Sequence, residues 1–390
     1  MQMKVKLGDM FEIGSGGTPS KTHPEYYGGD IPWVKTGDLK SEYLYEVEDF
    51  ITEEGLNNSS AKVYDTDTVL IAMYGATIGA TSILKMSACT NQACAAFKKN
   101  EKVIPEYLYY FLKSQKEKFV RDGVGGAQPN ISAGYLKKVE MELPSLEEQK
   151  VIVEILDKIS EIVLKRNQEI QVLDDLIKAR FVEMFGSIYD GKFDMKTLSD
   201  IVCDDKNSIK RGPFGGALKK DDFVDEGYLV YEQRHAIHND FRYAKYYITQ
   251  EKYEDMIGFK VVPGDLIISC SGVTLGRIAE VPEGAKEGII NQALLKLSLN
   301  QDVMLNTFFI QQFRGEEIQD ILFGFSRGSG IPNMPSMSEV KAVKFICPPL
   351  ELQKQYCDFV HQVDKLKLQV QKSLDETQLL FDSLMQQYFG

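Results

Sequence analysis

The stretch Pro-Ser-Leu-Glu-Glu-Gln-Lys at residues 144–150 recurs as Pro-Pro-Leu-Glu-Leu-Gln-Lys at residues 348–354. The same spacing relates Phe185-Gly186 to Phe389-Gly390. For motifs nearer the N-terminus, the two copies are separated by fewer residues. Asn91-Gln92-Ala93 recurs as 291–293, and Gly75-Ala76-Thr77-Ile78-Gly79 recurs as Gly-Val-Thr-Leu-Gly at 272–276. An internal repeat fixes the architecture of its chain, so this sequence consists of two copies of one unit.

The changing spacing separates each copy into two parts. Loops absorb inserted residues, whereas one added residue in a packed helix rotates every later side chain by about 100°. The spacing changes through the first part of each copy and is constant over the last part, after residues 144 and 348. We therefore predict a loop-rich module followed by a rigid helix, twice.

Both predicted helices carry apolar residues at alternating steps of four and three, the pattern of a coiled-coil seam. The seam is interrupted by Arg166 in the first helix and Lys367 in the second. We expect the two helices to pack on each other; the alternative is that each packs on its own module. The predicted seam residues are Ile152, Leu156, Ile159, Val163, Ile170, Leu173 and Ile177, and then Tyr356, Val360, Val363, Val370, Leu374 and Phe381.

The modules have mixed α and β patterns. Short apolar runs at 69–73 and 266–269 follow turn residues and predict buried strands, while 105–119 and 303–313 predict helices. Glycine-rich loops follow at 123–126 and 324–330. The predicted fold class is α+β, with these segments: module 1–145, helix 146–186, module 187–347 and helix 348–390.

Composition restricts the function classes. The 390 residues include 45 Lys+Arg and 57 Asp+Glu, a net charge of −12, which disfavours a stand-alone nucleic-acid binder. No apolar run reaches about 18 residues and no signal-peptide pattern opens the chain, so we expect no membrane association. The six cysteines form no C-x-x-C pair, which favours reduced thiols and a cytoplasmic location.

No catalytic or metal-binding constellation is recognisable. The sequence has no G-x-x-x-x-G-K-[ST] phosphate loop and no Pro-Asp pair to begin a common nuclease site. Gly14–Gly17 leads into Thr-Pro-Ser rather than into a helix, which argues against a cofactor cradle. His235 and His238 have no third ligand nearby, and we interpret them as solvated loop histidines. We predict no catalytic residue, no metal site and no cofactor on this chain.

Several motifs together carry a family resemblance. They are Gly-Ser-Gly-Gly-Thr-Pro-Ser-Lys at 14–21, Ile-Pro-Trp-Val-Lys-Thr-Gly-Asp-Leu at 31–39, Arg-Gly-Pro-Phe-Gly-Gly-Ala-Leu-Lys at 211–219, and the two helix starts. With the order module, helix, module, helix, the chain resembles the specificity (S) subunit of type I restriction-modification systems over essentially its whole length.

The resemblance implies a function and partners. Two globular α/β target recognition domains would each read one half of a bipartite site in double-stranded DNA, asymmetric because the modules differ. Long antiparallel coiled-coil helices would set the spacer and dock two methyltransferase (M) subunits, and restriction/translocase (R) subunits would join. S-adenosylmethionine, ATP and Mg²⁺ would bind only those partners. The alternatives are the equivalent subunit of a fused-restriction system, and an autonomous methyltransferase or nuclease.

The candidate DNA-binding residues are loop donors and acceptors, since base edges and phosphates are recognised by such groups. Gln128 is the preferred adenine reader, and Arg234, Arg277 or Arg327 would suit guanine. The first-module candidates are Thr18, Ser20, Lys21, Lys35, Thr36, Tyr74, Thr77, Gln128 and Asn130. The second-module candidates are Lys210, Arg211, Lys219, Lys220, Gln233, Arg234, Thr274, Arg277, Arg327, Ser329 and Asn333.

Residues that are the same in both modules are interpreted as framework residues, and residues that differ between the modules as candidates for base recognition. We expect a retained residue to hold the shared fold, because the two modules are expected to read different bases. We therefore assign Asn91, Gln92, Asn291 and Gln292 to the framework. The acidic faces of the helices, with Glu147, Glu148, Glu154, Glu161 and Glu169, are either solvated surface or docking surface for partner helices.

Overall fold

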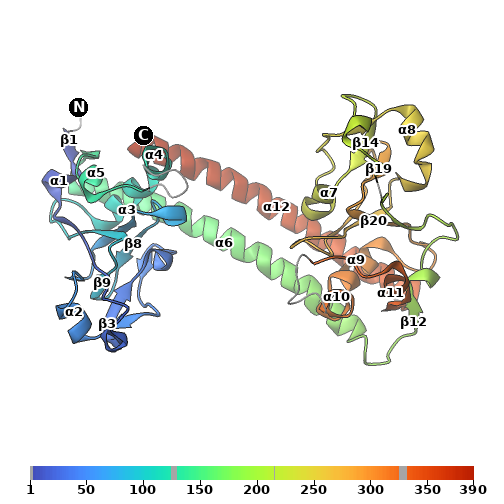
Figure 1. Cartoon of the computed structure of the whole chain (residues 1–390), viewed down its shortest axis with the longest axis horizontal. Coiled ribbons are helices and arrows are strands. Elements are labelled where there is room, and N and C mark those ends of the chain that lie inside the picture. Colours follow the sequence, from blue (N-terminus) through green and yellow to red (C-terminus); the bar gives the residue numbers. More distant parts are fainter. Residues whose placement is uncertain (1–2, 124–129, 215, 325–331) are drawn as a thin grey trace. The chain divides into compact units, whose positions relative to one another are not determined.

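The chain forms two compact units in a computed structural model that describes residues 3–123, 130–214, 216–324 and 332–390 (Figure 1). One unit comprises residues 1–168 and 371–390, and the other comprises residues 169–370. Two 40-residue helices, α6 (Leu146–Phe185) and α12 (Leu350–Phe389), each contribute one half to either unit. The mixed α and β composition agrees with the predicted fold class.

The first module is built from three sheets. One has five strands in the order β2-β10-β7-β8-β4, one has four in the order β5-β3-β9-β6, and β1 pairs with β11. The strands are β1 (Met3–Lys6), β2 (Ile13–Ser15), β3 (Tyr27–Val34), β4 (Tyr43–Leu44), β5 (Phe50–Ile51), β6 (Val63–Tyr64), β7 (Val69–Ala72), β8 (Thr81–Leu84), β9 (Ala88–Thr90), β10 (Cys94–Phe97) and β11 (Glu140–Leu143).

The second module repeats this plan. Its sheets have the orders β13-β20-β17-β18, β15-β14-β19-β16 and β12-β21, and the parallel pair β14·β19 matches β3·β9. The strands are β12 (Met195–Thr197), β13 (Ile209–Arg211), β14 (Tyr228–Tyr231), β15 (Tyr247–Ile248), β16 (Lys260–Val261), β17 (Leu266–Ser269), β18 (Ile278–Glu280), β19 (Gly288–Ile290), β20 (Leu294–Leu297) and β21 (Lys344–Ile346). The predicted buried strands are β7 and β17.

The helices of the modules differ in detail from the prediction. The helix expected at 105–119 is two helices, α3 (Pro105–Ser114) and α4 (Lys116–Asp122), because Gln115 turns the chain there and donates its side-chain amide to the Phe389 carbonyl at 3.2 Å. The helix expected at 303–313 begins later, as α9 (Asn306–Arg314). The others are α1 (Leu7–Met10), α2 (Glu53–Asn57), α5 (Ala133–Leu136), α7 (Gln233–His238), α8 (Gln250–Asp255), α10 (Glu316–Phe323) and α11 (Met337–Ala342).

A buried glutamine explains why the helix-start motif occurs twice. The Gln149 side chain donates to the Pro144 and Lys102 carbonyls and accepts from the Ile104 N–H, at 2.9–3.0 Å. Gln353 makes the equivalent bonds to Pro348, Val303 and Leu305. Both side chains are fully buried. Each glutamine thus fastens the first turn of a long helix to the loop that begins α3 or α9.

We predict that Gln149→Leu lowers the free energy of unfolding of the first unit by about 3 kcal/mol. Leucine fills a similar volume but leaves one buried N–H and two carbonyls without their partner. The single tryptophan, Trp33, lies in the first module and reports its unfolding by fluorescence in urea. Gln168→Leu, at an exposed position of the same helix, is the control. Equal unfolding midpoints for the two variants would contradict the role of Gln149.

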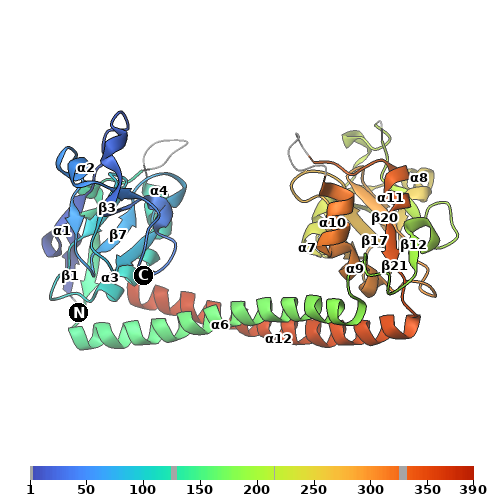
Figure 2. The same ribbon diagram turned by 90° about the horizontal axis from the view of Figure 1, so that it is seen from below.

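The ends of the long helices are anchored by aromatic residues. Phe389, at the end of α12, contacts Tyr107 of α3 with ring centroids 5.3 Å apart, in the core of the first module. Phe185, at the end of α6, contacts Phe308 of α9 at 4.9 Å, in the core of the second. Figure 2 shows the C-terminus beside α3. Each module therefore holds the beginning of one helix and the end of the other.

The two helices run antiparallel in each unit. In the first, Leu156 and Ile159 share a core with Phe381 and Met385. In the second, the Tyr356 hydroxyl donates to the Ile177 carbonyl at 3.2 Å.

The predicted seam residues lie on buried or partly buried faces. Both predicted arrangements occur, since the helices pack on each other and also on the modules. The helix ends pack on the module cores as well as on the other helix. Leu156, Ile159, Ile177, Tyr356, Val360, Val363, Val370 and Phe381 are buried; Ile152, Val163, Ile170, Leu173 and Leu374 are partly buried. Lys367, the polar interruption, forms an ion pair with Asp174 of α6.

Candidate nucleic-acid interface

The same glycine turn follows the central strand of each module. Gly75 and Gly79 after β7, and Gly272 and Gly276 after β17, all have φ between 66° and 80°, the left-handed region that favours glycine. Isolated bridges join Tyr74 to Asn130 and Ser271 to Asn333, so each turn is tied to the segment after the glycine-rich loop. Val273, at the turn of the second module, is 98% exposed. The repeat therefore builds two equivalent loop clusters.

In each module, one further glycine and one asparagine hold the loops next to this turn in place. A Cβ on Gly16 or on Gly212 would lie 1.8 Å from the carbonyl oxygen of Thr90 or Asn291, so only glycine fits. The Asn91 and Asn291 side chains accept from the N–H of Ala93 and Ala293 at 3.1 and 3.0 Å. These equivalent contacts are consistent with the prediction that Asn91 and Asn291 are framework residues.

A tight turn after the parallel strand completes each cluster. The Lys35 N–H donates to the Asp38 carboxylate at 2.7 Å, and the Glu232 N–H donates to Nδ1 of His235 at 3.0 Å. His235 also bonds through Nε2 to the Tyr243 carbonyl. Its interpretation as a solvated loop histidine is wrong: it is fully buried on α7, where the ring replaces the carboxylate that caps the first module's turn.

Several first-module candidates already have hydrogen-bond or ion-pair partners, some of them in other loops. Thr18 donates to Gln92, and the Thr77 hydroxyl donates to the Tyr74 carbonyl at 3.2 Å. Lys35 pairs with Asp49 and lies 5.4 Å from the Trp33 ring centroid. Lys21, Tyr74 and Asn130 are exposed, and Thr36 is partly exposed.

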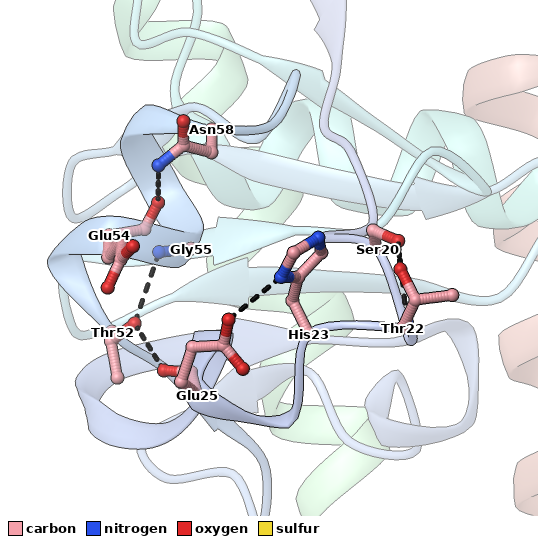
Figure 3. Close-up of polar contacts among 8 residues, drawn as sticks. All are labelled: Ser20, Thr22, His23, Glu25, Thr52, Glu54, Gly55 and Asn58. Carbon is pink, nitrogen blue, oxygen red and sulfur yellow. Dashed lines mark hydrogen bonds and ion pairs between the residues drawn. The ribbon is translucent and has the colours of Figure 1, made fainter.

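The loop that carries Lys21 is held by short-range contacts, drawn in Figure 3. The Ser20 and Thr22 hydroxyls are 2.7 Å apart, and His23 bonds to the Glu25 carboxylate at 2.8 Å. The Thr52 hydroxyl donates to the Glu25 carbonyl at 3.1 Å and accepts from Gly55 N–H, which joins the loop to α2. Lys21 lies between the two bonded hydroxyl residues, so its backbone is positioned while its side chain is exposed.

In the second module the structure brings Arg211, Gln233 and Asn333 together around the glycine turn. Gln233 donates to the Ser271 carbonyl and hydroxyl at 3.1 and 3.0 Å, and Arg211 donates to the Asn333 side chain at 3.0 Å. The Thr274 carbonyl accepts from the Ser269 hydroxyl. Arg277, Lys219 and Lys220 are exposed, and Lys210 lies 4.8 Å from the Phe259 ring centroid.

Arg234 lies apart from that group. Its guanidinium is 4.2 Å from the Tyr243 ring centroid, and it lines a cavity of about 640 Å³ with His238, Asn239 and Arg242. The candidates Gln128, Arg327 and Ser329 fall outside the described residues, so their assignments remain predictions.

Sequence reasoning missed several residues of the second cluster: Phe214, which is 65% exposed, Ser271 and Val273. Base edges and phosphates are bound mainly by polar and charged side chains, so the exposed apolar Phe214 and Val273 were not among the predicted residues. The available signal was the difference between copies, since Ser271 stands where the first module has Tyr74. Among the described residues, no three histidine, cysteine or acidic side chains lie close enough to hold a metal ion. Within the same residues, no helix is both long and apolar enough to cross a bilayer.

The fold and the loop clusters define a protein with two related α+β modules joined to two long helices. The profile of the type I restriction modification DNA specificity domain matches residues 2–174 and 211–377. The chain therefore belongs to the family of type I restriction-modification specificity subunits, with two DNA specificity domains.

Curated relatives carry matching names. The MjaIX specificity subunit of Methanocaldococcus jannaschii is 32% identical over 185 residues, 46% of this chain and 43% of the relative. The EcoR124I/EcoR124II specificity subunit of Escherichia coli is 30% identical over 39% of each chain. The matches thus span less than half the length of these two relatives.

Solved structures share the fold. The S subunit from M. genitalium aligns with a TM-score of 0.57 at 15% identity, over 100% of this chain and 96% of that one. A chain from a study of complex assembly and conformational transition of the type I R-M system aligns with a TM-score of 0.62 at 16% identity, covering 99% and 97%.

Proposed function

We propose that this chain is the non-catalytic DNA-reading and scaffold subunit of a type I restriction-modification complex. Each module reads one half of an asymmetric bipartite site in double-stranded DNA. The main support for this proposal is that residues at equivalent loop positions differ between the two modules, whereas the residues that hold those loops are the same. Asn91 and Asn291 make the same contact, whereas Tyr74 is replaced by Ser271. Different donors and acceptors at equivalent positions suit different base pairs.

The long helices set the spacer and dock M subunits in this proposal. Exposed apolar side chains, which mark interaction surfaces when they gather, occur along both helices in each unit. They include Leu164, Leu379 and Leu380 in the first unit, and Val172, Leu176, Leu366 and Leu368 in the second. Two equivalent helix surfaces are consistent with two M subunits, to which R subunits would add.

The net charge of −12 also fits a reading subunit that depends on partners. Non-specific affinity for DNA comes mainly from neutralising phosphates, and this chain carries more acidic than basic side chains. The M subunits would supply much of that attraction together with S-adenosylmethionine, and the R subunits would bind ATP and Mg²⁺. The reduced cysteines are consistent with assembly in the cytoplasm.

The test is methylome sequencing of cells that express this chain with its cognate M subunits. We expect one split, asymmetric motif, absent when the chain is omitted. Purified chain alone, incubated with DNA and S-adenosylmethionine, should transfer no methyl groups. Methyl transfer by the isolated chain would overturn the scaffold role and favour an autonomous enzyme.

Arg234 is expected to contact a phosphate rather than a base. It shares an open cavity with Arg242 and Asp240, which pair with each other, so Arg234 is the cavity's cation without a paired carboxylate among the described residues, and its ring contact with Tyr243 leaves the charge accessible. Arg234→Ala should weaken binding of the M-containing complex to all duplexes alike and reduce the salt slope by about one. Lys341→Ala, at an exposed position of α11, is the charge-matched control. Loss confined to one base pair would instead make Arg234 a base reader.

A further inference from the structure

Arg211 has an unusually constrained side chain for a surface arginine. It ends β13, donates from Nη2 to the Asn333 side-chain oxygen at 3.0 Å, and lies with its guanidinium 5.2 Å from the exposed Phe214 ring centroid. Its Nε is buried and has no hydrogen-bond partner among the described residues. The side chain is therefore held on two sides without a paired carboxylate among those residues.

Asn333 is itself fixed in orientation. Its side-chain oxygen accepts a second bond, from the Met334 N–H at 3.0 Å, so two donors meet at that atom. Its backbone forms a bridge with Ser271, and the Ser271 hydroxyl accepts from Gln233. Three segments that are distant in sequence thus hold the Arg211 fork in place.

The remaining donors of the fork suit one base. Asn333 accepts from Nη2 and Nε is buried, so the donors that remain for a ligand are those of Nη1 and the second Nη2 hydrogen. Two parallel N–H donors on a planar group match the O6 and N7 acceptors of guanine in the major groove. A side chain already fixed by its neighbours loses less conformational freedom on binding, which favours discrimination.

We propose that Arg211 reads a guanine in the half-site of the second module and that Asn333 is its positioning residue. This inference rests on the proposed function. It replaces Arg234, Arg277 and Arg327 as the first choice for guanine. In the first module Ser15 occupies the equivalent place: Ser15 pairs with Ala95 of β10 as Arg211 pairs with Leu295 of β20. A serine hydroxyl makes no bidentate contact, so this guanine contact belongs to the second half-site alone.

The test uses the complex of this chain with its M subunits and duplexes that carry the motif from the methylome. Each G·C pair of the second half-site is replaced in turn, and each guanine is also replaced by 7-deazaguanine, which lacks the N7 acceptor. Wild-type complex should lose about 10- to 100-fold in affinity at one position. Arg211→Lys keeps the charge but removes the fork, and should bind guanine and its replacements equally there.

Two Asn333 variants separate positioning from folding. Asn333→Ala should reduce discrimination at that same position, whereas Asn333→Asp retains an acceptor for both donors and should preserve the preference for guanine. Discrimination within the first half-site should be unchanged in every variant, which shows that the chain is folded and assembled. An altered preference there as well would contradict the assignment to one base.

Different results would refute the role of Arg211 and the proposed function on which it rests. A second half-site without any G·C pair, or undiminished guanine preference in Arg211→Lys, would refute the role of Arg211 and leave the proposed function standing. A wild-type complex without sequence preference in either half-site would refute the proposed function itself.

Discussion

Inserting one heptad into α6 after Gln168 and another into α12 after Val370 should abolish methylation of the original site and create a site with a longer spacer. Both positions lie where one unit gives way to the other, so the contacts inside each unit are retained. Seven helical residues add about 10.5 Å, which corresponds to at most about three base pairs. Methylome sequencing gives the new spacer directly, and both half-sites should be unchanged.

The matched control is the same insertion in α6 alone. The helices run antiparallel, with Tyr356 bonded to Ile177 and Lys367 paired with Asp174 in the second unit. A single insertion cannot lengthen one helix without displacing such pairs in one unit, so we expect loss of all methylation. An unchanged spacer in the double insertion would refute the role of the helices in setting it.

Phe389→Ala should destabilise the first unit by about 3–5 kcal/mol, since it leaves a cavity in a closely packed core. The Phe389 ring contacts Tyr107 and Phe111, and its carbonyl accepts from Gln115 at the break between α3 and α4. Loss of the ring therefore weakens the attachment of α12 to the first module. Urea unfolding followed by Trp33 fluorescence measures the effect.

Leu379→Ala is the control for that substitution. Leu379 lies on the same helix but is 71% exposed, so its removal should change the free energy of unfolding by less than about 0.5 kcal/mol. Similar stabilities of Phe389→Ala and Leu379→Ala would show that the end of α12 is not anchored in the first module.

The repeat made most of the fold predictable. A motif that is retained in two diverged copies maintains the fold that the copies share. The structure shows how several of these motifs do so. Gln149 and Gln353 close the same three hydrogen bonds, and Gly16 and Gly212 leave room for the same carbonyl. The coiled-coil period likewise indicated the two long helices, because apolar spacing depends only on local helix geometry.

The candidate site was less predictable, for physical reasons. A side chain's availability depends on partners that are distant in sequence, such as Asp49 for Lys35 and Gln92 for Thr18. His235 was misassigned because its two partners, the Glu232 N–H and the Tyr243 carbonyl, form a buried capping site that spacing alone does not reveal.

By itself, the sequence determined that the chain has two related modules, where the long helices begin, and which residues hold the shared frame. Those properties follow from local periodicity and from comparison of one copy with the other. Only the tertiary structure decided that each module holds the start of one helix and the end of the other. Only it singled out Arg211 among the many basic residues, because its guanidinium is oriented by Asn333, which is distant in sequence and is brought beside it by the fold.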